Sequence, residues 1–241
     1  MINWKKRLYD EYVSSGQNSV DIESSSNNYN PYIEMIIKKH LPKNKSISII
    51  DLACGSGGLI GSLKKNGFDN LMGIDVSQEQ VNTANNLGIY EAKCQDIDSF
   101  FKEQKKNSFD VIFLMDILEH FEKHEVLDLL DNVKSILKDN GMLIIHVPNA
   151  LGVFGMNIRY GDFTHESAFT SRSIMQVLSV CGFGKIKCYE DSPIIHSLNS
   201  FFRFIIWHVL ILPFRLLLLA ETGVTRHLLS QNILVIAKIS D

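Results

Sequence analysis

The chain has 241 residues, and 45% of them are hydrophobic, which suits one α/β domain with a large buried core rather than two domains of ordinary size. Its formal net charge of -3 provides no overall basic field, which argues against an extended nucleic-acid surface. We therefore expect a small-molecule or carbohydrate ligand and no nucleic-acid partner.

Cysteine usage and the N-terminal segment bear on the compartment. The four cysteines form no CxxC pair, and the first residues are polar and aromatic rather than the apolar stretch of a signal peptide. Both features predict a cytoplasmic protein in a reducing environment. Cys54 follows a predicted strand, but no base accompanies it in its motif, so we expect a packing role for this thiol.

Apolar runs of strand length alternate with helical stretches along most of the chain. Such alternation is typical of parallel strands joined by right-handed crossovers. The fold class predicted is therefore α/β, with a doubly wound, seven-stranded, mostly parallel sheet. The predicted strands are residues 46–51, 70–75, 89–94, 109–114, 142–147, 184–189 and 232–239. The predicted helices are residues 31–40, 58–66, 77–87, 117–137 and 171–181.

The predicted domain organisation has three parts. Residues 1–30 form an N-terminal flap, whose Ser- and Asn-rich residues 16–30 connect it to the main domain of residues 31–241. Within that domain, residues 192–230 are an apolar insertion before the last strand.

The centre of the insertion, residues 201–220, reads FFRFIIWHVLILPFRLLLLA. It is long enough to span a bilayer, but an arginine near the centre of a span costs about 2.5–3.5 kcal/mol. A helical wheel does not place Arg203 opposite a clean apolar face, so a single amphipathic helix is also an imperfect description. Three alternatives stay open: a surface that covers the core or forms a homodimer, peripheral contact with a membrane, and a true span.

A glycine turn follows the first predicted strand, in the sequence DLACGSGG that begins at Asp51. Gly55 and Gly57 allow the backbone to approach a ligand closely, and the next helix offers its N-terminus. Asp75 ends the second predicted strand, where a carboxylate can bind both hydroxyls of a ribose. Asp96 follows the third. A dinucleotide site fits poorly, because Ile60 stands where the GxGxxG motif requires its third glycine.

This series of acids around a GxG turn resembles the class I S-adenosylmethionine-dependent methyltransferases over residues 46–147. The resemblance implies a Rossmann-like methyltransferase fold and S-adenosylmethionine as cofactor. It also implies that Asp51 helps hold the amino-acid end of the cofactor and that the turn approaches it. Ala53 stands where the family often has glycine. The full set implied to bind the cofactor is Asp51, Ala53, Gly55, Gly57, Asp75, Val76, Asp96, Ile97 and Met115.

A second motif, DILEH, follows the fourth predicted strand. If a helix starts there, Asp116, Glu119 and His120 lie on one face, and two carboxylates with one imidazole suit Mg²⁺ or Mn²⁺. The alternative is a metal-free helix N-terminus. The motif resembles the ExxEH of metal-dependent ubiquinone-pathway O-methyltransferases and of small-RNA 2′-O-methyltransferases. The latter add a histidine from further along the chain, for which His165 is the candidate, and His120 or His165 would serve as the base.

The polar loop of residues 148–169 follows the fifth predicted strand, where this fold places substrate loops. Its RYGDFTHE segment is similar to methyltransferases of bacterial surface-polysaccharide synthesis. The resemblance implies O-methylation of a sugar or sugar-containing precursor of a capsule or lipopolysaccharide, at the inner face of the membrane. A quinone-like hydroxyl, an RNA hydroxyl and a non-catalytic cofactor-binding scaffold stay open as alternatives. We expect the polar side chains of this loop to bind the acceptor, namely Arg159, Tyr160, Asp162, Thr164, His165 and Glu166.

Overall fold

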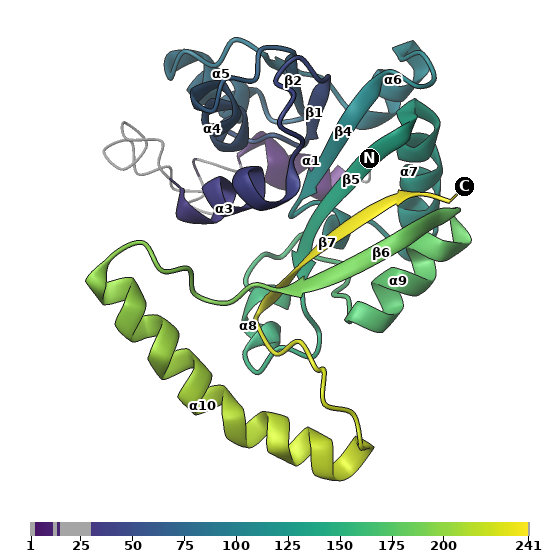
Figure 1. Cartoon of the computed structure of the whole chain (residues 1–241). Helices are drawn as coiled ribbons and strands as arrows, with labels where there is room; N and C mark the ends of the chain where they lie inside the picture. Colours follow the sequence, from purple (N-terminus) through teal and green to yellow (C-terminus); the bar gives the residue numbers. More distant parts are fainter. Residues whose placement is uncertain (1–2, 12–13, 15–29, 241) are drawn as a thin grey trace.

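The computed structural model describes residues 3–11, 14 and 30–240 (Figure 1). A seven-stranded sheet with the order β3-β2-β1-β4-β5-β7-β6 forms its centre. Strands β1 to β5 are parallel, and β7 is antiparallel to both of its neighbours, β5 and β6. The predicted doubly wound, mostly parallel sheet is therefore confirmed. Its strands are β1 (Ile49–Leu52), β2 (Leu71–Asp75), β3 (Ala92–Cys94), β4 (Phe109–Met115), β5 (Leu137–Pro148), β6 (Phe183–Glu190) and β7 (Asn232–Ile239).

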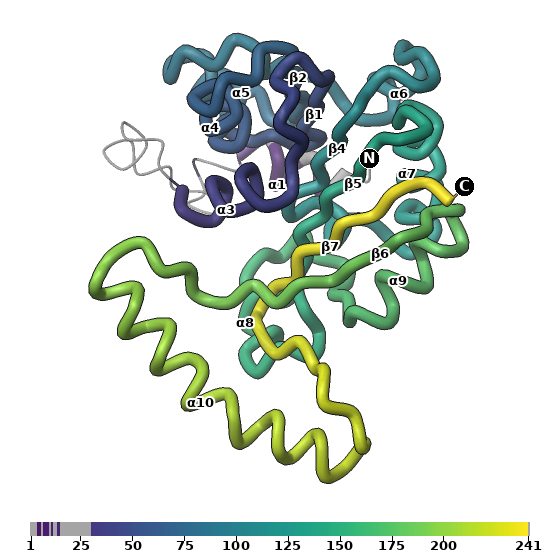
Figure 2. Tube along the Cα trace, viewed as in Figure 1, coloured from purple at the N-terminus to yellow at the C-terminus, as the bar shows by residue number. Residues whose placement is uncertain are grey.

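The helices form two layers, one on each face of the sheet (Figures 1 and 2). Helices α3 (Pro31–His40), α4 (Gly58–Lys65) and α5 (Gln78–Asn86) belong to one layer. Helices α6 (Ile97–Glu103), α7 (Lys123–Ile136) and α9 (Ser171–Val180) belong to the other. The described chain also contains α1 (Asn3–Asp10), the 3₁₀ helix η1 (Leu118–His120), α8 (Gly155–Arg159) and α10 (Leu198–Thr222).

Alternate residues of the central strands enter the two cores, because successive side chains of a strand point to opposite faces. Ile112 and Leu114 of β4 pack with the α7 and α9 layer, whereas Val111 and Phe113 pack with the α3 and α4 layer. All four are almost completely buried. This double burial explains why the strands read as continuous apolar runs in the sequence.

Two predicted boundaries were wrong for local reasons. The helix expected at residues 117–137 is interrupted, because Asp116 has a φ of 54° and only the short η1 follows it before α7 begins at Lys123. A capping box between Glu122 and Glu125 sets that start. Strand β5 begins at Leu137 rather than residue 142, since Leu137 pairs with Phe109 ahead of a register shift.

The structure describes the predicted insertion but only part of the predicted flap. Most of residues 1–30 lie outside the described residues, so the flap stays a prediction; α1, which is described, packs against the body through Lys5. The apolar insertion is a 25-residue helix, α10, that lies apart from the two helix layers (Figure 1). It joins the neighbouring strands β6 and β7.

Gly73, in the middle of β2, is a test of how tightly the sheet packs against α4. A Cβ added there would lie 2.3 Å from Ile60 Cδ1 and 2.8 Å from Cys54 Sγ. We expect Gly73→Ala to lower the free energy of unfolding by about 1–3 kcal/mol, measured by urea denaturation. Gly58→Ala is the control, since no atom lies within 4 Å of its added Cβ. An unchanged Gly73→Ala midpoint would contradict this packing.

Candidate active site

A cavity of about 830 Å³ lies at the carboxyl ends of the parallel strands. This edge is where ligands of open α/β sheets bind. The cavity is lined from β1 by Asp51, from β2 by Asp75 and from β4 by Met115, and α1 contributes Lys5 and Tyr9. Of the nine residues predicted to bind the cofactor, eight line it: Asp51, Ala53, Gly55, Asp75, Val76, Asp96, Ile97 and Met115.

The glycine turn has an unusual backbone. Ala53, Gly55 and Gly57 have φ values of 65°, 51° and 78°, the left-handed region that favours glycine. Ala53 therefore occupies a conformation that disfavours a Cβ, which fits the glycine that the family resemblance implies at this position. Gly57 does not line the cavity, and its role in cofactor binding stays a prediction. It caps α4, and an added Cβ would lie 2.9 Å from Ile89 Cγ2.

Asp75 binds the turn as well as facing the cavity. Its carboxylate accepts the backbone N–H of Gly55 at 2.8 Å and that of Ser77 at 2.8 Å, one at each oxygen. Burial raises the pKa of Asp75, and the two backbone donors oppose that shift. Each oxygen retains a further lone pair for a ligand hydroxyl.

Asp51 and Asp96 differ sharply in environment. Asp51 is buried, its Oδ1 has no hydrogen-bond partner among the described residues, and burial raises its pKa well above the usual value. A cationic ligand group beside it would restore the charged form. Asp96 is exposed and caps α6 by accepting the Ser99 N–H at 3.0 Å.

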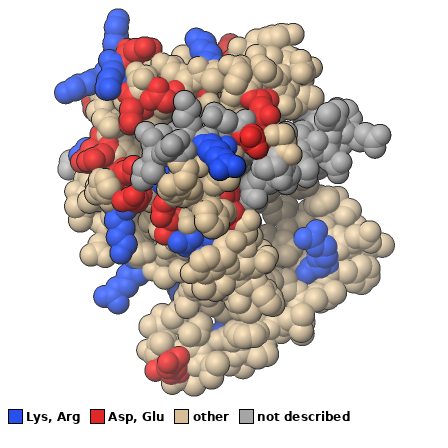
Figure 3. Space-filling model, turned by 180° about the vertical axis from the view of Figure 1, so that it is seen from behind, with Lys and Arg blue, Asp and Glu red and all other residues tan. Residues whose placement is uncertain are grey.

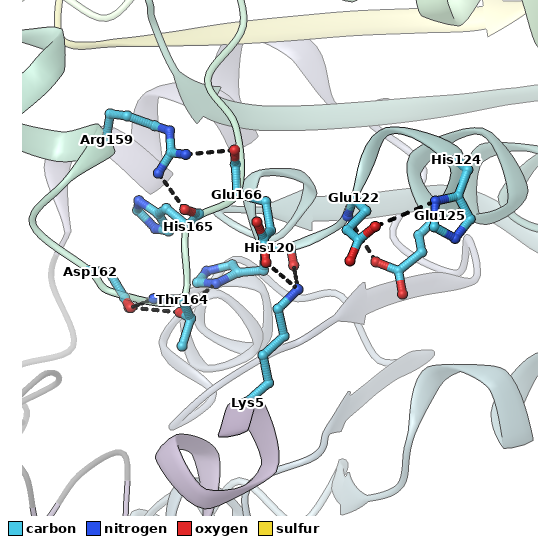
Figure 4. A network of polar contacts seen from close by, with 10 residues as sticks. All are labelled: Lys5, His120, Glu122, His124, Glu125, Arg159, Asp162, Thr164, His165 and Glu166. Carbon is cyan, nitrogen blue, oxygen red and sulfur yellow. Dashed lines mark hydrogen bonds and ion pairs between the residues drawn. The ribbon is translucent and has the colours of Figure 1, made fainter. Parts of the chain in front are cut away.

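His120 is held by a chain of hydrogen bonds (Figure 4). Its Nδ1 lies 2.8 Å from the Thr164 hydroxyl, and that hydroxyl lies 2.6 Å from Asp162 Oδ1. Because Thr164 has one proton to donate and Asp162 is an acceptor, Thr164 accepts from His120 Nδ1–H. This arrangement fixes the tautomer that leaves Nε2 with a free lone pair. Burial, together with the nearby His165, lowers the pKa of His120 to about 4, so the ring is neutral at pH 7.

Glu119 and His165 lie behind His120 and do not line the cavity. Neither carboxylate oxygen of Glu119 has a hydrogen-bond partner among the described residues, although the side chain is only 1% exposed. Burial raises its pKa well above the usual value. His165 Nε2 lies 3.9 Å from Glu119 Oε1, and its Nδ1 donates to the carbonyl of Ile158 at 3.0 Å. The ligand atoms of Glu119, His120 and His165 all lie within 4.8 Å of one another.

Asp116 is not part of this group, which corrects the predicted set of metal ligands. Its left-handed backbone turns the side chain to His146, whose Nδ1 lies 2.6 Å from Asp116 Oδ1. His146 Nε2 lies 3.2 Å from Asp191. Burial lowers the pKa of His146, but the two carboxylates outweigh it and raise the pKa to about 10. The expected helical face of Asp116, Glu119 and His120 does not exist, because no α-helix starts at Asp116.

Several polar side chains of residues 148–169 form hydrogen bonds within this loop. Arg159 donates to the backbone carbonyls of His165 and Glu166, and Asp162 accepts from the backbone and hydroxyl of Thr164 (Figure 4). Glu166 forms an ion pair with Lys5 at 3.0 Å. These contacts engage Arg159, Asp162, Thr164 and Glu166, whereas Tyr160 is 69% exposed, and acceptor binding by this loop stays a prediction.

Three residues of the site were missed in the sequence. Lys5 of α1 is 6% exposed and donates to the carbonyl of His120 at 2.8 Å, and Tyr9 lines the cavity beside it (Figure 4). Both residues lie in the predicted N-terminal flap, but no pattern in that segment singled them out. His146 also lines the cavity, and a lone histidine within the apolar run of β5 was its signal.

A family model described as "Methyltransferase domain" matches residues 28–187, which is more than half of the chain. The chain therefore belongs to this methyltransferase family and contains a class I S-adenosylmethionine-dependent methyltransferase domain. The resemblance inferred from the acids and the GxG turn is confirmed at this level.

Among similar proteins, the ubiquinone biosynthesis O-methyltransferase of Rickettsia canadensis (strain McKiel) is 30% identical over 124 residues, 49% of this chain and 51% of that protein. The chain thus spans about half the length of the curated relatives it matches. A SAM-dependent methyltransferase from Archaeoglobus fulgidus has a TM-score of 0.64 at 17% identity, covering 90% of this chain and 97% of the other. The 1,6-didemethyltoxoflavin-N1-methyltransferase of Burkholderia thailandensis, solved with S-adenosylhomocysteine, has a TM-score of 0.60 at 13% identity, covering 99% and 89%. At these identities, the two structures show a shared fold.

The buried ion group at His146 predicts a pH dependence of stability. Its pKa is raised from about 6.5 to about 10, so its contribution is complete below pH 6.5 and is lost as pH rises toward 10. We expect the melting temperature of His146→Gln to fall furthest below that of the wild type at acid-to-neutral pH, and the gap to narrow toward pH 10. Exposed His124→Gln is the control. A gap that stays constant from pH 6 to about 10 would refute the assignment.

Proposed function

We propose that this chain transfers a methyl group from S-adenosylmethionine to a hydroxyl oxygen of a small-molecule or carbohydrate acceptor, with His120 as the general base. The observation that carries this proposal is the chain of hydrogen bonds from His120 through Thr164 to Asp162. It presents a neutral imidazole with a free Nε2 at a residue that lines the cavity.

The cofactor would be held by the eight predicted residues that line the cavity. Asp51, buried with an unpartnered oxygen, suits the ammonium of the amino-acid end. Asp75 suits the ribose hydroxyls, because its two backbone donors hold the carboxylate in a fixed orientation. Ile97 and the exposed Asp96 would line the adenine.

The bound sulfonium supplies an electrophilic methyl group, so the protein needs only to align the acceptor and remove its proton. His120 Nε2 takes the hydroxyl proton as the oxygen forms its bond to the methyl carbon, and the carbon–sulfur bond breaks with its electron pair on sulfur. Asp162 then stabilises the imidazolium through Thr164. His165 does not line the cavity, so the predicted alternative base is not favoured.

A divalent cation fits Glu119, His120 and His165, since a buried carboxylate without a hydrogen-bond partner faces two imidazoles. One carboxylate with two imidazoles suits Mn²⁺ better than Mg²⁺, which prefers oxygen ligands. Such an ion, when bound, would lower the pKa of a hydroxyl that coordinates it; of the three residues, His120 alone lines the cavity. A His120 nitrogen that binds the ion could not also take a proton. Another group would then have to remove the proton of the substrate hydroxyl.

Two acceptor classes follow from different observations. The first class, a sugar-containing precursor of a bacterial surface polysaccharide, is supported by the resemblance of the RYGDFTHE segment. Against it, most polar groups of that segment form hydrogen bonds within the loop. A quinone-like phenol is favoured by the relatives named ubiquinone biosynthesis O-methyltransferase. A panel of catechols and nucleotide-activated sugars, incubated with S-adenosylmethionine, separates the two. No product from any acceptor would leave the non-catalytic scaffold as the better explanation.

Replacement of His120 tests the general base. We expect His120→Asn to bind S-adenosylhomocysteine with the wild-type affinity in calorimetry and to lower kcat by about 10²–10⁴-fold. The matched control is His124→Asn, an exposed histidine on α7, which should retain full turnover. Wild-type turnover in His120→Asn would refute the assignment.

Replacement of Glu119 tests the metal site without an activity assay. We expect Mn²⁺ to raise the melting temperature of the EDTA-treated wild type more than Mg²⁺ does, and Glu119→Gln to lose this increase. Asp116→Asn is the control that should retain it, because Asp116 pairs with His146 instead. Loss of the increase in Asp116→Asn, or its absence in the wild type, would contradict the proposed ligand set.

A further inference from the structure

Helix α10 carries the largest group of exposed apolar side chains in the described chain. It is long and apolar enough to cross a membrane by length and composition, yet only 6% of its most apolar window is buried. In the view of Figure 3, the lower part of the molecule, where α10 lies, is almost uncharged. Its large hydrophobic residues that are exposed are Leu198, Phe201, Phe202, Ile205, Ile206, Val209, Leu210, Leu212, Phe214, Leu216, Leu217 and Leu219.

The helix nevertheless has an inner face, which holds Ser200, His208 and Arg215, whereas Asn199, Arg203, Glu221 and Thr222 are exposed. Buried or half-buried positions recur at helical spacing along one side: Ser200, Phe204, Trp207, His208, Ile211, Arg215 and Leu218. Arg215 forms an ion pair with Glu190 at the end of β6. His208 Nδ1 donates to the carbonyl of Phe204 at 2.8 Å. His208 and Arg215 therefore face the body of the protein, whereas Arg203 and the polar residues at the two ends of the helix are exposed.

The outer face is apolar over its full length. At about 100° per residue, Phe202, Val209 and Leu216 share one line along the helix, opposite Ile211. Arg203 lies at the boundary between the two faces and is exposed. The apolar arc covers about half of the circumference, wider than the narrow seam through which two helices pair.

The connections of α10 exclude a span. The helix leaves from β6 and returns to β7, two strands paired within one sheet, so both ends must be on the same side of a bilayer. After a span, residues 223–231 would have to cross back through about 30 Å of hydrocarbon. These residues are not helical, and their backbone groups would find no partners there.

We propose that α10 lies in the surface of a lipid bilayer, parallel to its plane, with its outer face among the acyl chains. In this position the protein body takes the place of the polar face of an amphipathic helix, and the apolar face enters the boundary of the acyl chains by about 5–10 Å. Arg203 then lies at the level of the lipid headgroups. A second copy of the chain would cover a stripe of this face and leave the rest of the apolar arc in water.

The position of α10 also relates to the methyl-transfer cavity. A second cavity, of about 480 Å³, is lined by Arg203 and Trp207 of α10, and Asn30 and Tyr32 line both cavities. If the proposed function holds, acceptors dissolved in the bilayer would approach the site along this side. The binding experiment below uses no acceptor, so its result is independent of that function.

Vesicle flotation tests the proposal directly. We expect the full chain to float with vesicles of phosphatidylethanolamine and phosphatidylglycerol, and F202S/V209S/L216S to lower the bound fraction by more than about tenfold. The matched control, Y90S/M175S/V180S, removes exposed apolar side chains elsewhere and should bind as the wild type does. Wild-type binding that is absent, or unaffected by the first variant, would overturn the proposal.

The depth of single tryptophans in the bilayer distinguishes a helix parallel to the membrane plane from one that spans it. Tryptophans introduced singly at Phe202, Val209 and Leu216, with Trp4 and Trp207 replaced by Phe, should be quenched equally by shallow brominated lipids. Strongest quenching of the middle position by deep labels would indicate a span and refute the in-plane helix. Light scattering without vesicles covers the remaining case: a dimer that F202S/V209S/L216S dissociates, together with no vesicle binding, would assign the face to a second copy.

Discussion

Carboxylates buried at one edge of the sheet are the constraint around which this site is built. Asp51 and Asp75 end neighbouring parallel strands, and Glu119 follows the strand beside them. Burial raises the pKa of all three, so each is costly in the charged form unless a partner approaches it. Backbone donors supply partners for Asp75, whereas Asp51 and Glu119 keep unpartnered oxygens among the described residues. These are the two carboxylates that the proposed ammonium of the cofactor and the proposed cation would neutralise.

Beside the cavity, the loop of residues 148–169 and Lys5 of α1 hold His120 in place through their polar groups. Arg159 and Asp162 form hydrogen bonds within the loop, and these bonds hold Thr164 next to His120. Lys5 of α1 joins the carbonyl of His120 to the carboxylate of Glu166. A rigid wall of this kind orients one imidazole, which is what proton removal from an aligned hydroxyl requires.

The insertion of α10 leaves the sheet unaffected because it enters between two strands that are already paired. β7 pairs with β5 from Asn232 to Lys238 and with β6 across one register shift, so the helix adds a surface to the domain while the sheet stays continuous. The same connectivity restricts what the helix can do. Both ends return to one sheet, and an apolar helix under that restriction can lie on a bilayer but cannot cross it.

Local sequence patterns were sufficient to predict the strands, most helices and the glycine turn. Burial on both faces of a strand requires a continuous apolar run, and a left-handed backbone favours glycine, so both can be recognised within a few residues. The acids at the ends of β1 and β2 could be predicted for the same reason. The resemblance to metal-dependent methyltransferases also pointed to His165, which lies beside His120 and Glu119. The hydrogen bond from His120 to Thr164 could not be predicted, since Thr164 comes from a loop more than forty residues away. The sequence by itself thus determined the fold and the edge of the sheet that carries the site. Only the tertiary structure decided that Asp116 pairs with His146 and that Arg215 of α10 pairs with Glu190, because both outcomes depend on contacts between distant segments.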